Sequence, residues 1–207
     1  MSGPYTYPHP AYYVTTDVVV FTFRDARLHV LLIERGMEPY RGKWALPGGF
    51  LRPGEELEAC ARRELTEETA LEQFLLEQVT TVGSIDRDPR GRVITVAYLA
   101  LVRWGSAVKG GSDARDARWF ALDQLPKLAF DHGDLIKAGR ARLEQMLDDR
   151  PMLLLKFLPE EFGIEDMQRV YDAVLAKTPD RRAFYKKVSS LNLKKTRQTG
   201  RVGAAKD

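Results

Sequence analysis

Three glutamates with the spacing of one helical face stand in the stretch "RELTEE", at Glu64, Glu67 and Glu68. On a helical wheel all three fall in the same arc as the neighbouring apolar residues, which are Leu57, Cys60, Ala61 and Leu65. Carboxylates on an inward face repel one another, so they hold protons or bind a cation. A divalent cation that prefers oxygen ligands would neutralise this negative charge. The wheel alone leaves a metal site and an ordinary acidic helix end equally open.

The spacing around these acids decides between the two. Gly49 is followed after five residues by Glu55, and after seven more by Arg63-Glu64-Leu65-x-Glu67-Glu68-x-x-Leu71. This pattern resembles the Nudix box, a motif of about nine fixed positions, and all but one are matched here. The resemblance implies a Nudix fold: a mixed sheet between helices, with the box forming a loop, a helix and a second loop.

In the Nudix family, the helix carboxylates hold Mg²⁺ or Mn²⁺ against a diphosphate. By position, the resemblance makes Glu64 and Glu68 the main metal ligands. Glu67 would be an additional ligand, and so would the Gly48 carbonyl. The same three glutamates are then the catalytic residues. The implied chemistry is attack of metal-activated water on phosphorus. The general base would be a box glutamate or an acid on a distant loop.

Two further sets of residues complete this expected site. Gly49, Glu55 and Arg63 would be structural, with Arg63 pairing with Glu55 at the helix entrance. Arg35, Arg41 and Lys43 precede the glycine loop and could meet substrate phosphates, although plain surface charge explains them as well. Asp113 and Asp116 are candidates for the distant base, although loop solvation is the better explanation for them.

One box position departs from the family pattern. Ala70 stands where the family has glycine. A glycine just past a helix takes a left-handed conformation that costs another residue roughly 1–2 kcal/mol. The departure puts the helix exit in doubt but removes no metal ligand.

The elements that position the box are predicted from sequence patterns. Runs rich in β-branched and aromatic residues predict a hairpin at 12–35, and two further strands at 76–85 and 92–104. Helical spacing predicts helices at 55–69 and 131–147, the second with Asp131 as a possible N-cap. His132 is interpreted as capping or packing, and the single Cys60 as core. Residues 1–150 are predicted to form the Nudix domain.

The pattern changes near residue 150. An apolar stripe at Ile164, Met167, Val170 and Val174 predicts a helix, and "RRAFYKKVSSL" predicts a second one after Asp180. From Lys177 onward, ten Lys or Arg stand against two Asp, a net charge of +8, whereas the whole chain of 207 residues carries +3. Two short helices joined by a tight turn, the second one basic, favour a helix-turn-helix at 151–207.

This second part resembles the winged helix of the Nudix-related transcriptional regulators of NAD metabolism. Basic residues on the second helix and the following wing-like stretch would contact DNA, although a solvated basic face is the alternative. They are Arg181, Arg182, Lys186, Lys187, Lys194, Lys195, Arg197 and Arg201. The second wing strand would only begin at "GRVGAAKD", so either the wing is minimal or the chain is cut short.

The fold expected is therefore α+β, a Nudix α/β/α sandwich followed by a small winged helix-turn-helix domain. The function expected is a repressor of NAD-metabolism genes that binds ADP-ribose or a relative with Mg²⁺, retains the glutamates for hydrolysis, and binds a double-stranded operator as a homodimer. The alternative is an ADP-ribose pyrophosphatase whose C-terminal domain serves dimerisation. No apolar run approaches the roughly 18 residues needed to span a membrane, and the lone cysteine suits the cytoplasm.

Overall fold

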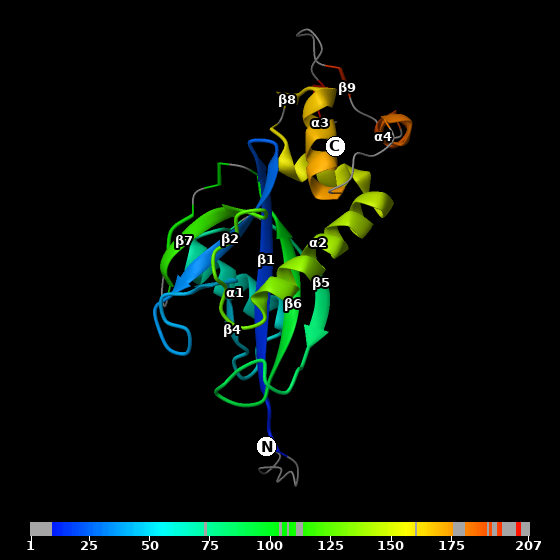
Figure 1. Cartoon of the computed structure of the whole chain (residues 1–207). Coiled ribbons are helices and arrows are strands. Elements are labelled where there is room, and N and C mark those ends of the chain that lie inside the picture. Colours follow the sequence, from blue (N-terminus) through cyan, green and yellow to red (C-terminus); the bar gives the residue numbers. More distant parts are fainter. Residues whose placement is uncertain are drawn as a thin grey trace.

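The computed structural model describes residues 10–72, 74–103, 105–106, 108–110, 114–159, 161–175, 181–189, 191, 194–195 and 202–203. It shows an N-terminal body built around one large sheet, and a smaller C-terminal part that packs at one end of it (Figure 1). No helix in the described part of the chain combines the length and apolar character that a membrane span requires.

The large sheet has seven strands and is mixed. Its main path runs β3 (Trp44–Ala45), β2 (Arg27–Arg35), β1 (Tyr13–Arg24), β6 (Val93–Leu101) and β5 (Leu75–Val82); β4 (Gly48–Phe50) pairs with β1, and β7 (Ala114–Ala121) pairs with β2. The β1–β6 pair is parallel and the other pairs are antiparallel. The predicted hairpin is confirmed, with Asp25 and Ala26 at positive φ in its two-residue turn.

Strand β1 explains why both faces of the sheet are covered. Its side chains alternate between faces: Val18 and Val20 lie in one buried cluster, whereas Val19 and Phe21 lie in the other. The first cluster contains residues of α1 (Leu57–Thr69) and the second contains residues of α2 (His132–Asp149). The sheet is therefore sandwiched between helices, as predicted.

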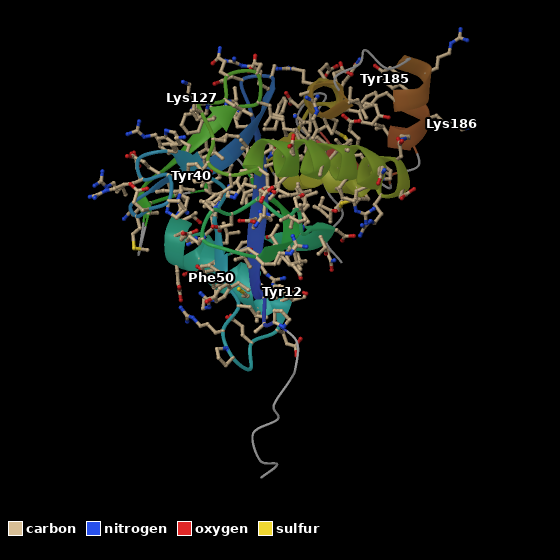
Figure 2. All side chains as sticks on the ribbon, turned by 60° about the horizontal axis from the view of Figure 1, so that its bottom comes forward. Tyr12, Tyr40, Phe50, Lys127, Tyr185 and Lys186 are labelled. Atoms are coloured by element: carbon tan, nitrogen blue, oxygen red, sulfur yellow. The ribbon has the colours of Figure 1, made fainter. Side chains whose placement is uncertain are left out.

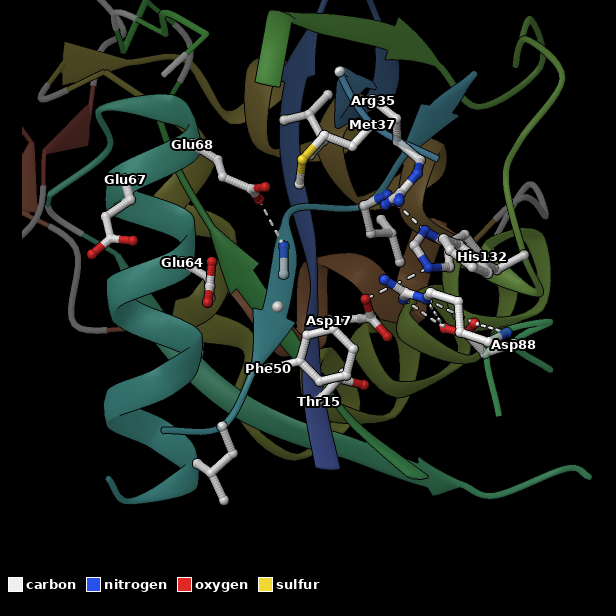
Figure 3. Close-up of a pocket in the computed structure, with 18 of the residues that line it drawn as sticks. Thr15, Asp17, Arg35, Met37, Phe50, Glu64, Glu67, Glu68, Asp88 and His132 are labelled. Carbon is white, nitrogen blue, oxygen red and sulfur yellow. Dashed lines mark hydrogen bonds and ion pairs between the residues drawn. The ribbon is translucent and has the colours of Figure 1, made fainter. Parts of the chain in front are cut away.

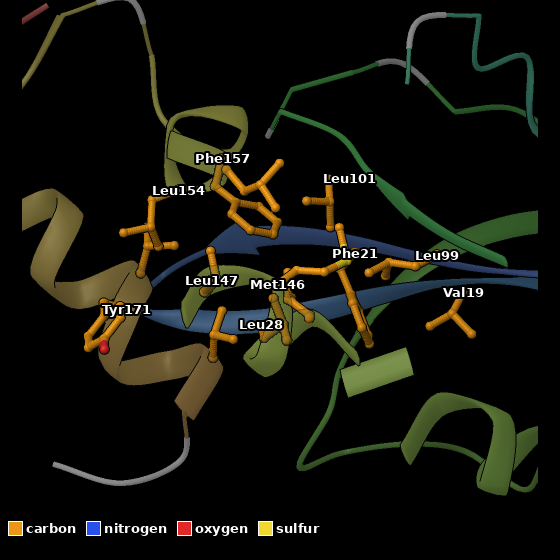
Figure 4. Packing of buried hydrophobic residues seen from close by; sticks show 14 of the residues in the cluster. Val19, Phe21, Leu28, Leu99, Leu101, Met146, Leu147, Leu154, Phe157 and Tyr171 are labelled. Carbon is orange, nitrogen blue, oxygen red and sulfur yellow. The ribbon is translucent and has the colours of Figure 1, made fainter. Parts of the chain in front are cut away.

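The C-terminal part shares the second of these clusters. It consists of the short 3-10 helix η1 (Pro151–Phe157), β8 (Glu161–Phe162), α3 (Ile164–Leu175), α4 (Arg181–Ser189), β9 (Lys194–Lys195) and β10 (Val202–Gly203). Leu154, Phe157 and Tyr171 pack in one continuous core with Phe21 and Leu28 of the hairpin (Figure 4). Burial on this scale fixes the C-terminal part against the sheet.

The small sheet of the C-terminal part has the order β8-β10-β9. Val202 pairs with both Phe162 and Lys195, so both expected wing strands form, each two residues long. The described strands thus correspond to a minimal wing. Helices α3 and α4 precede them in the order expected of a winged helix.

Helix α1 ends at Thr69, as predicted, and its exit at Ala70, which the sequence left in doubt, has the geometry of a glycine. Ala70 is the C-cap with φ 60° and ψ 18°, the left-handed conformation, and its N–H donates to the Thr66 carbonyl. The box position that usually holds glycine therefore keeps the glycine geometry while carrying a Cβ, which strains the backbone.

Candidate functional site

A cavity of about 560 Å³ opens beside α1, where β1 and β4 meet the loops that follow β2, β5 and β7 (Figure 3). Its size suits a nucleotide-sized ligand. Two of its walls carry opposite charge. Glutamates of α1 line one wall, and Arg35, Arg87 and Arg90 contribute to the other.

Two of the three box glutamates face the glycine loop. Glu68 is buried, and its Oε2 accepts a hydrogen bond of 2.8 Å from the Gly48 amide. Glu64 is half-buried against Gly49, where an added Cβ would lie 2.4 Å from the Glu64 Oε1. A side chain at position 49 would therefore displace the Glu64 carboxylate from its place beside the loop.

The third glutamate does not share this orientation. Glu67 is 40% exposed and pairs with Arg63 and Arg52, at 3.3 and 3.4 Å, at the rim of the cavity that it lines together with Glu64 and Glu68 (Figure 3). All three acids therefore line the cavity, but Glu67 is exposed at its rim and not turned inward like Glu64 and Glu68. A wheel places Cβ atoms, whereas a long side chain at the edge of the arc can turn to solvent.

The donors at this wall suit a divalent cation of the magnesium type. Among the described residues no group of three or more His, Cys, Asp or Glu side chains is arranged as a metal site. Mg²⁺, however, usually takes one or two protein carboxylates and completes its shell with water and substrate phosphates. Glu64 and Glu68, one helical turn apart beside the Gly48–Gly49 backbone, meet that requirement.

The predicted pair of Arg63 and Glu55 forms. Arg63 Nε and Nη2 donate to the two Glu55 oxygens at 2.7 and 2.9 Å. Hydrogen bonds from Arg63, and then from the Arg52 amide, lower the pKa of Glu55 to about 2. Arg63 Nη1 also donates to Glu64 at 2.6 Å. Arg63 thus joins the loop before α1 to the helix and holds Glu64 in place.

Of the three basic residues predicted to meet phosphates, only Arg35 lines the cavity. Its Nε donates to the Pro39 carbonyl at 2.8 Å. Burial, and then the charge of Arg90, lowers the pKa of Arg35. Two guanidiniums that repel one another at a cavity wall favour an anionic ligand. Arg41 and Lys43 are exposed and lie outside the cavity lining.

A buried polar network that the sequence did not reveal forms the floor of the cavity. Arg87 donates to Asp131 through Nε and Nη2 at 3.0 and 2.8 Å, and to Asp17 at 3.5 Å. Thr95 donates to Asp17 at 2.6 Å. Asp131 precedes α2 but makes no side-chain cap bond, because its carboxylate binds Arg87 instead. These residues come from four separate segments, so no local spacing signals the network.

His132 belongs to the same floor and begins α2. Its Nδ1 accepts a hydrogen bond of 2.8 Å from the Leu46 amide, and its Nε2 lies 3.5 Å from Asp17 Oδ1. Burial lowers the pKa of His132 in spite of the nearby acids. His132 is therefore a packing residue, as interpreted from the sequence, and it also forms part of the cavity lining. Cys60 is fully buried, as predicted.

Asp116, a candidate for the general base on a distant loop, lies away from the cavity. Asp116 is on β7, where its carboxylate binds Arg118 and the Ala117 amide, and it is not part of the cavity lining. Asp113 falls outside the described residues. Asp116 is therefore held as a surface ion pair.

The predicted DNA-contacting residues are described in part. Arg182 and Lys186 are exposed on α4, and Lys186 and Tyr185 lie at the outer surface of the molecule (Figure 2). Lys187 is half-buried, pairs with Asp148 of α2 and lies 5.6 Å from the Tyr171 ring centroid. The backbones of Arg181, Lys194 and Lys195 are described but their side chains are not, and Arg197, Arg201 and Asp180 fall outside the described residues.

Comparison with known proteins defines the class. Residues 13–139 match the NUDIX domain, and residues 154–206 match the NrtR DNA-binding winged helix domain. The chain belongs to the Nudix family, and within it to the proteins that carry an NrtR winged helix.

Three relatives illustrate the likeness. The ADPR responsive transcriptional repressor NtrR of Acinetobacter baylyi is 35% identical over 88% of this chain and 73% of that protein. The ADP-ribose pyrophosphatase of Methanocaldococcus jannaschii is 42% identical over 63% of this chain and 73% of its own length. Shewanella oneidensis NrtR in complex with a 27mer DNA has a TM-score of 0.74 and 32% identity, with 93% of each chain covered. Its NUDIX domain complexed with ADP ribose has a TM-score of 0.61 and 41% identity, covering 65% of this chain and 90% of that one.

Proposed function

We propose that this chain is a transcriptional repressor of NAD-metabolism genes that binds ADP-ribose in its Nudix domain and an operator through its winged helix. The observation that carries this proposal is the union of two features in one chain. A cavity with glutamates on one wall and guanidiniums on the other suits a metal-bound diphosphate. A basic helix, α4, presents Arg182 and Lys186 to solvent. The names of the relatives in Acinetobacter and Shewanella support both halves.

The ligand-binding half of the proposal assigns roles within the cavity. Glu64, Glu68 and the Gly48 carbonyl hold Mg²⁺ or Mn²⁺, and Glu67 contributes from the rim. Arg35 binds the phosphates from the opposite wall. When bound, the ion neutralises phosphate charge and acidifies a coordinated water. Gly49, Glu55 and Arg63 keep Glu64 in position.

The DNA-binding half assigns phosphate contacts to the exposed cations of α4 and the wing, with the helix in the major groove. A repressor on an operator with two-fold symmetry fits a homodimer. A role at DNA also fits the cytoplasmic location that the single cysteine suggests. We keep 1–150 and 151–207 as the proposed extents of the two domains.

A direct test measures operator affinity of the full chain with and without ADP-ribose and Mg²⁺. Duplexes from upstream of NAD-biosynthesis genes are compared with random duplexes at physiological salt, because phosphate contacts alone bind any sequence. Sequence-selective binding that changes at least several-fold with ADP-ribose supports the repressor. Equal affinity for both duplexes, or selective binding unaffected by ADP-ribose, contradicts it.

Hydrolysis of ADP-ribose is a second proposed activity, favoured by the presence of all three box glutamates and by the name of the Methanocaldococcus relative. Incubation with ADP-ribose and Mg²⁺ or Mn²⁺ should yield AMP. A protein that binds ADP-ribose but forms no AMP would use the cavity for sensing alone. AMP formation without sequence-selective DNA binding would favour the alternative, a pyrophosphatase whose C-terminal part serves dimerisation.

A further inference from the structure

Helix α2 contacts both the cavity and the C-terminal part of the molecule. Its first residue, His132, belongs to the cavity lining, and the carboxylate directly before it, that of Asp131, binds Arg87. From there α2 runs along the sheet toward α3 and α4 (Figure 1). One end of the helix therefore lies at the proposed ligand site, and the rest adjoins the proposed DNA-binding elements.

The contact at the cavity end is a buried ion pair. Arg87 lines the cavity, and its side chain is only 4% exposed. Its Nε and Nη2 both donate to Asp131, at 3.0 and 2.8 Å. An anionic group that enters the cavity would compete for the same guanidinium, because a guanidinium has a fixed set of donors. The pull of Arg87 on the start of α2 therefore depends on whether the cavity is occupied.

The contact with the C-terminal part is made by Arg140, midway along α2. Its Nε donates to the Val174 carbonyl at 3.2 Å, and its Nη2 donates to the carbonyls of Val174 and Ala173 at 3.1 and 3.2 Å. Both carbonyls belong to the last turn of α3, where carbonyls have no partner within their own helix. Glu144, one turn further along α2, lies 3.4 Å from the Arg140 guanidinium and orients it. Arg140 thus fixes the end of α3, beyond which the chain continues to α4.

The middle of α2 lies too close to the sheet to absorb a shift. A Cβ at Gly139 would lie 2.9 Å from the Val19 Cγ1 of β1, so the helix backbone is in direct contact with the strand at the residue before Arg140. Leu143, on the following turn, is fully buried in the core cluster that α3 shares. Close-packed interiors transmit strain, so a displacement at the start of α2 reaches Arg140.

We propose that α2 couples the cavity to α4, with the Arg87–Asp131 pair as the input contact and Arg140 as the output contact. This inference rests on the proposed function, because ADP-ribose is the anionic ligand and operator affinity is the property that changes. Asp131 and Arg140 are positioning residues: Asp131 acts through Arg87, and Arg140 acts through α3. Coupling between two sites of one protein typically changes an affinity about 5- to 150-fold, and here it requires both contacts.

The test measures a coupling factor, defined as the factor by which saturating ADP-ribose and Mg²⁺ change the operator affinity of the full chain. Arg140→Met removes the donors of the output contact and keeps an apolar stem, whereas Arg140→Lys keeps a donor. Asp131→Asn weakens the input contact. Arg142→Met is the matched control, because Arg142 lies on the same helix with a similarly exposed side chain, 33% against 29%, but pairs with Glu77 of β5 at 2.8 Å.

The wild type should show a coupling factor of about five or more. Arg140→Met and Asp131→Asn should each reduce it below about two, Arg140→Lys should recover part of it, and Arg142→Met should leave it unchanged. The affinity of Arg140→Met for ADP-ribose without DNA should not change, because Arg140 is not part of the cavity lining. A purely structural role would lower the melting temperatures of Arg140→Met and Arg142→Met alike and would leave the coupling factor as it is.

Hydrogen exchange, followed by mass spectrometry on peptides from α3 and α4, gives a readout that needs neither ADP-ribose nor DNA. In the ligand-free chain, Asp131→Asn should speed amide exchange in these peptides. Arg140→Met should do the same, and the double variant should exchange no faster than Arg140→Met alone, because the two contacts act in series. If Arg140→Met does not fold, Glu144→Gln, which removes only the ion pair that orients Arg140, takes its place and should give a smaller loss of coupling.

The outcomes separate the inference from the proposed function. A wild type that responds to ADP-ribose, together with an Arg140→Met variant that responds equally, overturns the inference and leaves the repressor intact. A wild type that does not respond contradicts the proposed function, and hydrogen exchange then decides the inference. Faster exchange in α3 and α4 of Asp131→Asn that Arg140→Met makes non-additive supports the coupling through α2; unchanged exchange, or additive effects, overturns it.

Discussion

The cavity of the Nudix domain and the helix α4 are both rich in charge, but they hold it differently. In the cavity, Arg87 and Arg90 are fixed by two or more hydrogen bonds to Asp131 and Asp88, which gives each side chain one position. On α4, Lys186 is exposed at the outer surface of the molecule (Figure 2). The difference suits the two ligands: a small molecule is discriminated by fixed geometry, whereas DNA phosphates are contacted by exposed charges.

The two regions are nevertheless joined. Helix α2 begins at the cavity with His132, and near its end Asp148 pairs with Lys187 of α4. Midway along α2, Arg140 donates to the carbonyls of Ala173 and Val174 at the end of α3, at 3.1 to 3.2 Å. One helix thus contacts both sites, and the shared core below it leaves little freedom for independent movement.

The largest expected effect is a loss of ligand affinity at the cavity that leaves DNA binding by α4 unchanged. Glu68→Gln removes a buried carboxylate of the proposed metal site and should weaken Mg²⁺-dependent ADP-ribose binding on the order of 100-fold. Operator affinity without ADP-ribose should not change, because α4 is untouched. Calorimetry and a DNA titration measure the two quantities. Glu58→Gln is the control, since Glu58 lies on the same helix in an exposed pair with Arg62. Retention of full ADP-ribose affinity in Glu68→Gln would place the metal elsewhere.

The next effect tests whether the shared core makes the two regions one cooperative unit. Phe184 of α4 is 1% exposed and packs 5.4 Å from the Tyr171 ring. Phe184→Ala should lower the free energy of unfolding by about 3–5 kcal/mol in a single transition. The neighbouring Tyr185 is 48% exposed, so Tyr185→Ala should cost far less. Denaturant titration followed by circular dichroism measures both. Two separate transitions would show that the C-terminal part unfolds alone.

Sequence patterns revealed the local parts of this structure and missed the non-local parts. The hairpin and α1 follow from local patterns, and the Arg63–Glu55 pair follows from the resemblance of a motif within about 25 residues. The exit of α1 at Ala70 was left in doubt, and the structure shows it left-handed. The floor of the cavity does not. Asp17 and Arg87 are 70 residues apart along the chain and meet only because β1 pairs with β6. The amphipathic stripe of α3 was visible, but its packing against the hairpin was not, because periodicity says which face is buried and not what covers it.

A smaller effect compares two adjacent lysines of α4. Lys186 is exposed and is assigned a phosphate contact, so Lys186→Gln should reduce the salt slope of DNA binding by about 0.9 and weaken all duplexes alike. Lys187 donates a hydrogen bond to Asp148 and lies over the Tyr171 ring. Burial lowers the pKa of Lys187, but the hydrogen bonds to Asp148 and Tyr171 and their charges together outweigh burial and raise it. Lys187→Gln should therefore change the slope less. A titration at four salt concentrations measures both slopes, and a larger change for Lys187 would show that DNA displaces the contact with Asp148.

The smallest effect concerns the exit of α1, on the cavity side of the comparison. Ala70 is left-handed, at a cost of roughly 1–2 kcal/mol, and glycine would remove that cost while adding freedom to the unfolded chain. Ala70→Gly should thus stabilise the protein by about 0.5–1 kcal/mol. Ala59, exposed within the same helix, offers the opposite case, because glycine there should destabilise by about 1 kcal/mol. Differential melting curves should therefore shift in opposite directions by a few degrees.

Equal destabilisation by both glycines would mean that Ala70 is not left-handed in solution. Because the exit of α1 lies only two residues beyond Glu68, a stabilised Ala70→Gly with unchanged ADP-ribose affinity would show that the box tolerates the departure without cost to the metal wall.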